Sequence, residues 1–444
     1  MSIWRPPLVW ITAGAVALVF LAALQSLAVT TVMPVVSADL DGASLYAVAF
    51  SGTLATSIIG MVVTGLWCDR SSPVAPLTAC VVLFVAGLVI AGTATTMPLL
   101  VVGRLVQGLG TGGQVVALYV VIARIYPPEM HGRVFAAFSA AWVVPSLVGP
   151  SIAGAVAEFL HWRWVFLGVA VLTALAYTLV ALRLRGAPLG IENPRREPVS
   201  LRLICSVVVA AGALALGFTA ELPIPAPLVI GVSLVLIAIA VKPLLPRGTL
   251  RVGRGLPSVV LMRGMIAGAL FGAEVYVPYV LIESYGFSPV WAGLGLTAAA
   301  LAWAGAADVS GRYGDRLGNR RIAALGVAGL VIATAGVGLF AFAGAPAWTI
   351  IVIWAFAGIG MGLMYPRLTV LTLAYSTPTD QGFNSAALSI FDSLGATVTI
   401  AVMGIVAVAL TGTGLEFAAV FAIAAALAVA SLIPGMRLGT ARVS

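Results

Sequence analysis

The sequence predicts an all-α polytopic membrane protein in which two six-helix bundles flank two additional transmembrane helices. Three observations support this fold class: the apolar composition, the spacing of the apolar runs and a loop motif that occurs twice. Of the 444 residues, 61% are hydrophobic and 9% are charged, whereas an ordinary soluble domain carries about 25% charged residues. The composition therefore excludes a typical soluble protein and indicates the lipid bilayer as the solvent of this chain.

Fourteen apolar runs have the length to cross the bilayer as helices. About 20 helical residues span the hydrocarbon layer, and a helix satisfies all of its backbone polar groups within one segment. The expected spans are 9–35, 45–67, 76–95, 98–123, 134–158, 164–182, 203–220, 224–241, 258–282, 289–310, 322–343, 347–372, 384–410 and 415–435. They predict an N-terminal bundle over 1–182, a linker with two additional helices over 183–257 and a C-terminal bundle over 258–444.

The basic residues test this arrangement. The chain has 23 Lys and Arg residues and a formal net charge of +8. With the N-terminus in the cytoplasm, nearly all of them, Arg263 included, fall on the cytoplasmic side, Arg163 falls outside, and Arg104 and Arg367 lie within spans. This asymmetry predicts that both termini are cytoplasmic. It requires that the runs 203–220 and 224–241 either both cross or both stay out, and we expect both to cross. Charge placed in this way excludes nucleic acid as a partner.

A loop motif occurs twice, each time after the second span of a six-span unit. The first copy, GLWCDR, contributes Gly65, Asp69 and Arg70, and the second, GRYGDRLGNRR, contributes Gly311, Asp315, Arg316, Gly318 and Arg320. The repeat indicates a duplicated bundle with a substrate path between the two halves.

With these loops the chain resembles the major facilitator superfamily, whose loop signature is G-x-x-x-D-R-x-G-R-R. The second copy is nearly complete, whereas the first has Ser72 and Pro73 in place of Gly and Arg. The resemblance implies that this loop acts as a cytoplasmic latch in which the Asp faces a helix N-terminus, and a carboxylate does stabilise that positive end. We expect Asp69 to face the start of the span near Asn384, in a latch weakened by the missing basic residue.

The fourth span contains GRLVQGLGTGG, which matches the superfamily's R-x-x-q-G-x-G signature at Arg104, Gln107, Gly108 and Gly110. An Arg inside a span is costly unless it faces a cavity or a partner. The resemblance implies that Arg104 takes part in proton coupling and that Gln107 lines the substrate cavity. The alternative is that Arg104 bonds to backbone carbonyls and only fixes helix packing.

The fifth span contains PSLVGPSIAG, which resembles the antiporter signature of exporters at Gly149, Pro150 and Gly154. Gly and Pro are common in membrane helices in any case. The motif gains weight from its position after the Arg104 motif, and the resemblance favours export over uptake.

The first span departs from a more specific resemblance. LQSLAVTTVMP is similar to the L-D-x-T-v-v-n-v-A-L-P signature of the fourteen-span drug:proton antiporter family, but Gln25 stands where that family has Asp. A neutral amide can bind a substrate in the cavity but cannot carry a proton. We therefore expect the coupling site elsewhere.

Two acidic residues lie at membrane depth and are candidate proton carriers. Glu274 lies about 16 Å beyond Arg263 along a helix, near the middle of the bilayer, and Tyr276 and Tyr279 flank it as candidate cavity residues. The alternative for Glu274 is a protonated carboxyl bonded to a neighbouring helix. Asp392 is the second candidate. It either carries a proton or pairs with Arg367 or the latch.

The resemblance as a whole implies a proton-coupled exporter of small hydrophobic or amphipathic compounds, such as drugs or secondary metabolites, that works by alternating access. Uptake by proton symport and a membrane sensor or scaffold that does not transport are the alternatives. We expect no enzymatic activity, cofactor or metal site, because the sequence has no nucleotide-binding loop and no cluster with metal-ligand spacing. We expect a monomer in a bacterial inner membrane, with protons and a small-molecule substrate as its partners.

Overall fold

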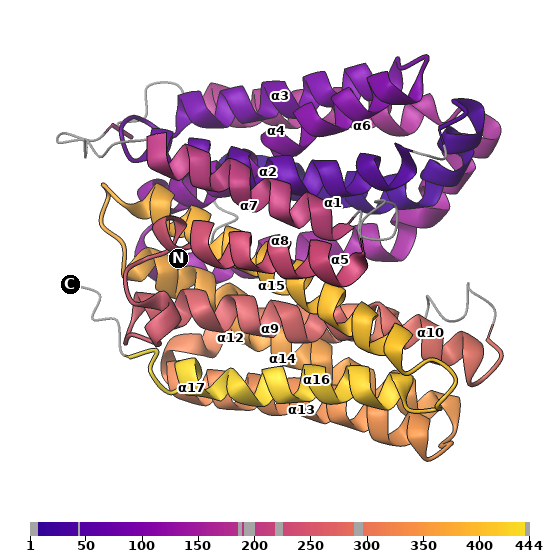
Figure 1. Cartoon of the computed structure of the whole chain (residues 1–444). Helices are drawn as coiled ribbons and strands as arrows, with labels where there is room; N and C mark the ends of the chain where they lie inside the picture. Colours follow the sequence, from indigo (N-terminus) through magenta and orange to yellow (C-terminus); the bar gives the residue numbers. More distant parts are fainter. Residues whose placement is uncertain are drawn as a thin grey trace. The chain divides into compact units, whose positions relative to one another are not determined.

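The structure is a computed structural model that describes residues 8–42, 45–184, 189–190, 200–217, 225–287 and 296–439. Its regular elements over these residues are helices (Figure 1). The first are α1 (Val9–Asp39), α2 (Tyr46–Cys68), α3 (Val74–Gly92), α4 (Met97–Ile125), α5 (Pro128–Phe159), α6 (Arg163–Leu184), α7 (Ser200–Gly217) and α8 (Ala226–Ala240). They are followed by α9 (Leu256–Glu274), α10 (Tyr276–Glu283), α12 (Thr297–Leu317), α13 (Asn319–Phe342), α14 (Ala347–Ala374), α15 (Gln381–Ala409), α16 (Glu416–Ala430) and α17 (Leu432–Gly435).

Ten helical segments of the described residues are long and apolar enough to cross a membrane. They comprise α1, α2, α3, α4, α6, α9 with α10, α13, α14, α15, and α16 with α17. Two shorter apolar helices, α7 and α8, are the additional central pair, whereas α5 and α12 are long but not among the ten. Helices thus occupy the expected runs over their described residues, while the count of fourteen spans and the side of the termini remain predictions.

The expected span 258–282 is interrupted rather than continuous. The first helix, α9, ends at Glu274, and α10 begins at Tyr276. Proline has no backbone N–H, so Pro278 cannot donate to the carbonyl of Glu274 four residues earlier, and its ring crowds that carbonyl. The break therefore has a cause in the sequence, and it puts Glu274 at the end of a helix.

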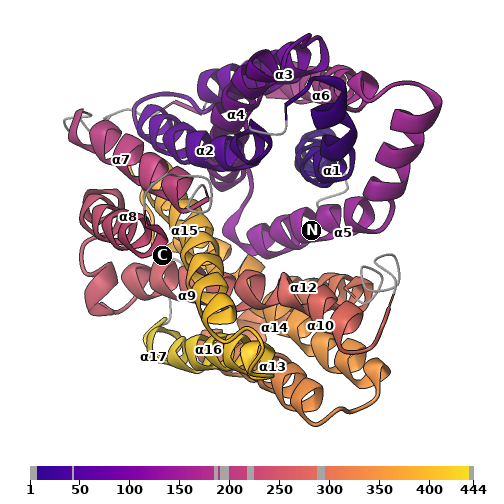
Figure 2. The same ribbon diagram turned by 45° about the vertical axis from the view of Figure 1, so that its right-hand side comes forward.

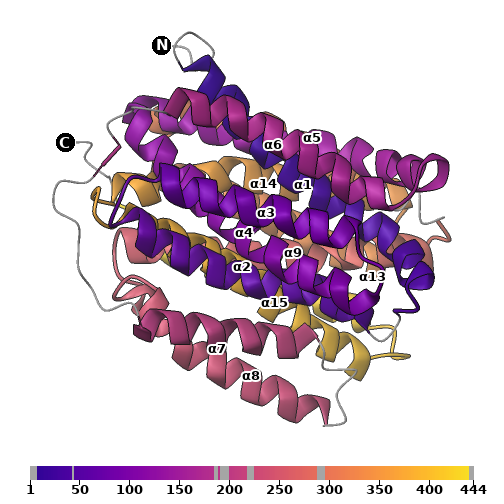
Figure 3. The same ribbon diagram turned by 90° about the horizontal axis from the view of Figure 1, so that it is seen from above.

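The chain forms two compact units, which we describe separately. Unit 1 comprises Met1–Val134, Ala141–Leu244 and Ser376–Ser389, and unit 2 comprises Phe135–Ala140, Leu245–Tyr375 and Ile390–Ser444. The additional helices α7 and α8 belong to unit 1 and lie side by side (Figure 3). The start of α15 also belongs to unit 1, although the rest of that helix is in unit 2.

In unit 1, α4 packs against both α2 and α3, and α7 packs along α2. The glycines of the α4 motif explain this close packing. A Cβ on Gly110 would lie 2.4 Å from the backbone nitrogen of Phe84 in α3, and one on Gly112 would lie 2.0 Å from the carbonyl oxygen of Ser57 in α2. Any larger residue at these positions would push the helices apart.

Unit 2 repeats this arrangement with α14 in the place of α4. It packs against both α12 and α13, and α9 packs against α14 and α16 (Figure 2). A Cβ on Gly358 would lie 1.9 Å from the carbonyl oxygen of Ala299 in α12, and one on Gly360 would lie 2.4 Å from that of Gly326 in α13. The correspondence of α2, α3 and α4 with α12, α13 and α14 agrees with the duplication indicated by the loop motif.

Candidate functional site

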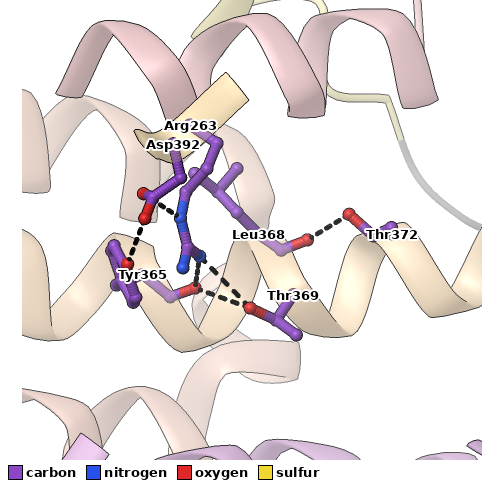
Figure 4. Close-up of polar contacts among 6 residues, drawn as sticks. All are labelled: Arg263, Tyr365, Leu368, Thr369, Thr372 and Asp392. Carbon is purple, nitrogen blue, oxygen red and sulfur yellow. Dashed lines mark hydrogen bonds and ion pairs between the residues drawn. The ribbon is translucent and has the colours of Figure 1, made fainter. Parts of the chain in front are cut away.

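A cluster of polar side chains surrounds Arg263 inside unit 2 (Figure 4). Arg263 comes from α9 and is 2% exposed. Its Nε donates a hydrogen bond of 2.7 Å to Oδ1 of Asp392 in α15. One terminal nitrogen also donates to the carbonyl oxygen of Tyr365 at 2.9 Å and to Oγ1 of Thr369 at 3.2 Å, both in α14. A single guanidinium therefore joins three membrane helices.

Asp392 has a hydrogen bond on each of its carboxylate oxygens. While Oδ1 accepts from Arg263, Oδ2 accepts a bond of 2.7 Å from the hydroxyl of Tyr365. The Tyr365 ring also lies against the guanidinium, with Cζ of Arg263 3.0 Å from the ring centroid. This geometry suits the ionised carboxylate, because both oxygens act as acceptors toward donors.

The structure places Arg263 inside a helix rather than in a loop. We expected this residue in a loop on the cytoplasmic side, but it lies about two turns inside α9 and is buried; its side of the membrane remains a prediction. Nor does Asp392 pair with Arg367, which instead bonds Asp315 at 2.7 Å and Asn319 at 2.8 Å. A signal was present in the sequence, since a basic and an acidic residue each interrupt an apolar run. What it lacked was the pairing of helices that brings them together.

Glu274 lies in the same unit, at the break between α9 and α10. In the described part of the structure its carboxyl has no hydrogen bond or ion pair. The rings of Tyr276 and Tyr279 follow it, with centroids 6.3 Å apart, and Tyr279 is 54% exposed. The two candidate acids thus differ in kind: Asp392 is tied to two partners, and Glu274 is not tied to any described residue.

Arg104 lies in unit 1 and has neutral partners. It is 5% exposed, and its Nε donates to the carbonyl oxygen of Ala49 at 3.1 Å. A terminal nitrogen donates to Oε1 of Gln107 at 2.7 Å. The structure thus brings together the two polar residues of the α4 motif, in the carbonyl-bonded geometry of the packing alternative. No carboxylate among the described residues forms an ion pair with Arg104.

Gln25 in α1 is fully buried, and neither its amide nitrogen nor its amide oxygen has a partner in the described structure. The α5 motif passes close to it, because a Cβ on Gly149 would lie 3.4 Å from Cδ1 of Leu24. At Gly154 a Cβ would meet nothing within 4 Å, so close packing with a described residue does not explain that glycine. The side chain of Pro150 lies outside the described residues.

The first loop motif meets the start of α15 within unit 1, as expected for Asp69. Its two carboxylate oxygens accept bonds from the backbone N–H groups of Gly382 at 2.6 Å and Phe383 at 2.8 Å. A Cβ on Gly65 would lie 2.6 Å from the carbonyl oxygen of Gly382, so only glycine permits this approach. Burial raises the pKa of Asp69 to about 7, while the two backbone hydrogen bonds oppose that rise. We call Gly65, Asp69, Gly382 and Phe383 the latch.

The second loop motif has different contacts. Asp315, with a side chain that is 81% exposed, pairs with Arg367 of α14 rather than with a helix N-terminus. Gly318 ends α12 and begins α13 at φ 80°, a backbone conformation that glycine adopts without strain. Gly311 is half-buried, and the basic residues of the two motifs, Arg70, Arg312, Arg316, Arg320 and Arg321, are exposed.

Comparisons with known proteins agree with this architecture. The family profile described as the Major Facilitator Superfamily matches residues 15–398 and 275–442. MFS transporter L2 of Phoma sp. is 26% identical over 423 residues, covering 88% of this chain and 68% of the relative. The multidrug efflux pump SdrM of Staphylococcus aureus is 21% identical over 405 residues, covering 87% of each chain.

A solved structure shows the same fold. The human organic anion transporter MFSD10 superposes with a TM-score of 0.70 at 15% sequence identity, covering 97% of this chain and 100% of that one. The repeated helix arrangement of this chain, the matched family profile and the membrane-length helices lead to one conclusion. The chain belongs to the Major Facilitator Superfamily and is a multi-pass membrane transporter.

Proposed function

We propose that this chain is a proton-coupled exporter of small hydrophobic or amphipathic compounds and works by alternating access. Export is supported by the likeness to a protein named as a multidrug efflux pump and by the antiporter motif around Gly149. Proton coupling rests on one observation, the carboxylate of Asp392 held between Arg263 and Tyr365 among membrane helices. In this proposal the proton gradient drives transport without a cofactor, in the inner membrane of a bacterium.

Asp392 is the coupling group in this proposal because its charge balances a buried cation. When Asp392 is ionised, it compensates the guanidinium of Arg263 and ties α9 to α15. A proton on Asp392 removes that compensation, and an uncompensated buried charge costs several kcal/mol. Proton binding therefore weakens the association of α9, α14 and α15 and favours their rearrangement.

Glu274 is the second candidate carrier. A charged carboxylate without a partner is costly in the hydrocarbon region, and the described structure gives Glu274 none. Glu274 lies at a helix break and is followed by Tyr276 and Tyr279, whereas Asp392 lies within the continuous helix α15. In this proposal Glu274 carries a proton next to the bound substrate. The two tyrosines, Gln25 and Gln107 bind the substrate, and Arg104 supports proton coupling.

The test is dye transport in inverted vesicles under an imposed pH gradient. The parent chain is expected to accumulate a lipophilic-cation dye, and Asp392→Asn is expected to abolish the dependence on the gradient. Glu274→Gln is measured beside it, and Asp308→Asn is the control, because Asp308 forms an exposed pair with Arg312 outside the cluster.

The outcomes separate the assignments. Loss of coupling in Asp392→Asn alone supports the cluster, and loss in Glu274→Gln alone moves the carrier to the helix break. Gradient-driven accumulation that survives both substitutions contradicts the proposed coupling groups. Dye movement in the opposite direction supports uptake instead of export.

A further inference from the structure

The start of α7 contacts the latch directly. Cζ of Arg202 lies 4.2 Å from the centroid of the Phe383 ring. A guanidinium over an aromatic face at this distance is attracted by the ring quadrupole. The backbone N–H of the same Phe383 bonds to Asp69. Phe383 is therefore held from two sides, by Asp69 at the end of α2 through its backbone and by Arg202 of α7 through its ring.

Leu189, a described residue of the stretch before α7, reaches the same place through Arg124 at the end of α4. Its terminal nitrogens donate to the carbonyl oxygens of Leu189 at 2.9 Å, Ser71 at 3.0 Å and Cys68 at 2.8 Å. They also donate to the carbonyl oxygen of Pro378 at 3.2 Å, just before α15. One guanidinium thus joins the end of α2, Leu189 and the loop that leads into the latch.

The first loop motif lacks the basic residue that this contact supplies. Pro73 occupies the position of an Arg in the family signature, and Ser72 that of a Gly. Arg202 brings a cation to the start of α15 from a different helix, and α7 packs along α2, the helix that ends just before Asp69. This contact points to a role at the latch for α7, one helix of the additional pair.

We propose that Leu189 and α7 form a third part of the latch, in which Arg202 is a positioning residue. It holds Phe383, and thereby the first turn of α15, against Asp69 at the end of α2. The inference deepens the proposed function, since alternating access requires the latch to open and close. It does not depend on which compound is carried or in which direction.

The test measures opening of the latch and requires neither substrate nor gradient. Spin labels are placed on Glu129→Cys, in the exposed first turn of α5, and on Thr377→Cys, which is exposed just before α15. Their separation is measured by pulsed electron paramagnetic resonance in liposomes. The three native cysteines are buried, and the parent chain without added cysteines gives the labelling background.

Arg202→Ala is expected to raise the ratio of long to short separations about two- to fivefold, which corresponds to about 0.5–1 kcal/mol for a cation–π contact. Arg202→Lys keeps the cation and is expected to retain most of the parent distribution. Phe383→Leu should produce the same shift as Arg202→Ala, and combining them should add little. Asp69→Ala is the positive control, and Arg254→Ala is the matched control because it removes an exposed positive charge from unit 2.

Two results would overturn the proposal. The first is that Asp69→Ala shifts the distribution of spin-label separations, whereas Arg202→Ala gives the same distribution as the control Arg254→Ala. The other is full additivity of Arg202→Ala and Phe383→Leu, because contacting residues must be energetically coupled. If the parent chain does not transport the dye but Arg202 and Phe383 are energetically coupled, the result counts against the proposed substrate class and leaves this inference standing.

Discussion

The two buried arginines of the membrane helices, Arg104 in unit 1 and Arg263 in unit 2, are compensated in different ways. Arg104 donates to neutral oxygens, one from a backbone carbonyl and one from the amide of Gln107. Arg263 donates to the carboxylate of Asp392 as well as to neutral oxygens. A proton can neutralise the carboxylate that Arg263 contacts, whereas the partners of Arg104 carry no charge that a proton could neutralise. The comparison thus distinguishes a fixed contact from one that can respond to a proton.

The largest effect is expected from breaking the charged contact. Arg263→Met leaves the half-buried carboxylate of Asp392 without its cation, and removing one partner of a buried pair costs about 3–5 kcal/mol. We expect a loss of that size in the free energy of unfolding, measured by denaturant titration in micelles. The double variant Arg263→Met with Asp392→Leu should recover most of it, and a double variant as unstable as the single one would contradict the pairing.

The next effect comes from the hydroxyl that shares the carboxylate. Tyr365→Phe removes one hydrogen bond to a charged group, which costs about 1.5–3 kcal/mol. The ring stays in its place beside Trp303, whose ring centroid is 5.3 Å away. The same denaturant titration measures the loss. Equal stability of Tyr365→Phe and the parent chain would show that this hydroxyl does not support the ionised form of Asp392.

A smaller effect is expected at the neutral contact. Arg104→Met leaves two neutral acceptors without a donor but also removes a buried cation that has no described acid beside it. Since these contributions oppose each other, we expect a net loss of about 1–2 kcal/mol. A loss as large as that of Arg263→Met would erase the difference between the two sites. Arg104→Lys, measured alongside, tests whether charge alone is sufficient there.

The smallest effect is expected at an exposed pair. Asp308 and Arg312 lie 2.9 Å apart one turn along α12, with side chains 55% and 62% exposed. Such pairs contribute about 0.3–0.5 kcal/mol. Asp308→Asn should therefore change the unfolding free energy by no more than this. It sets the baseline against which the two buried sites are compared, and raising the salt concentration should reduce the difference further.

The helices, the duplication and the family can be predicted from the residues alone, because these features depend on local properties. Apolar length predicts a membrane helix, since every backbone polar group must be satisfied within the segment. The glycines of the α4 motif and the contact of Asp69 with a helix N-terminus were also indicated by short motifs. Even the break after Glu274 was readable from Pro278, whose missing N–H acts on a residue four positions away.

Which charges compensate one another depends on how helices that are far apart in the sequence pack together. Asp392 is separated from Arg263 by 129 positions, and Arg202 contacts Phe383 from a helix outside both repeated bundles. Hydrophobic periodicity describes each helix alone and does not identify the helix that packs against it. The cost of burying a charge requires that partners exist, but their identity follows from how the helices pack.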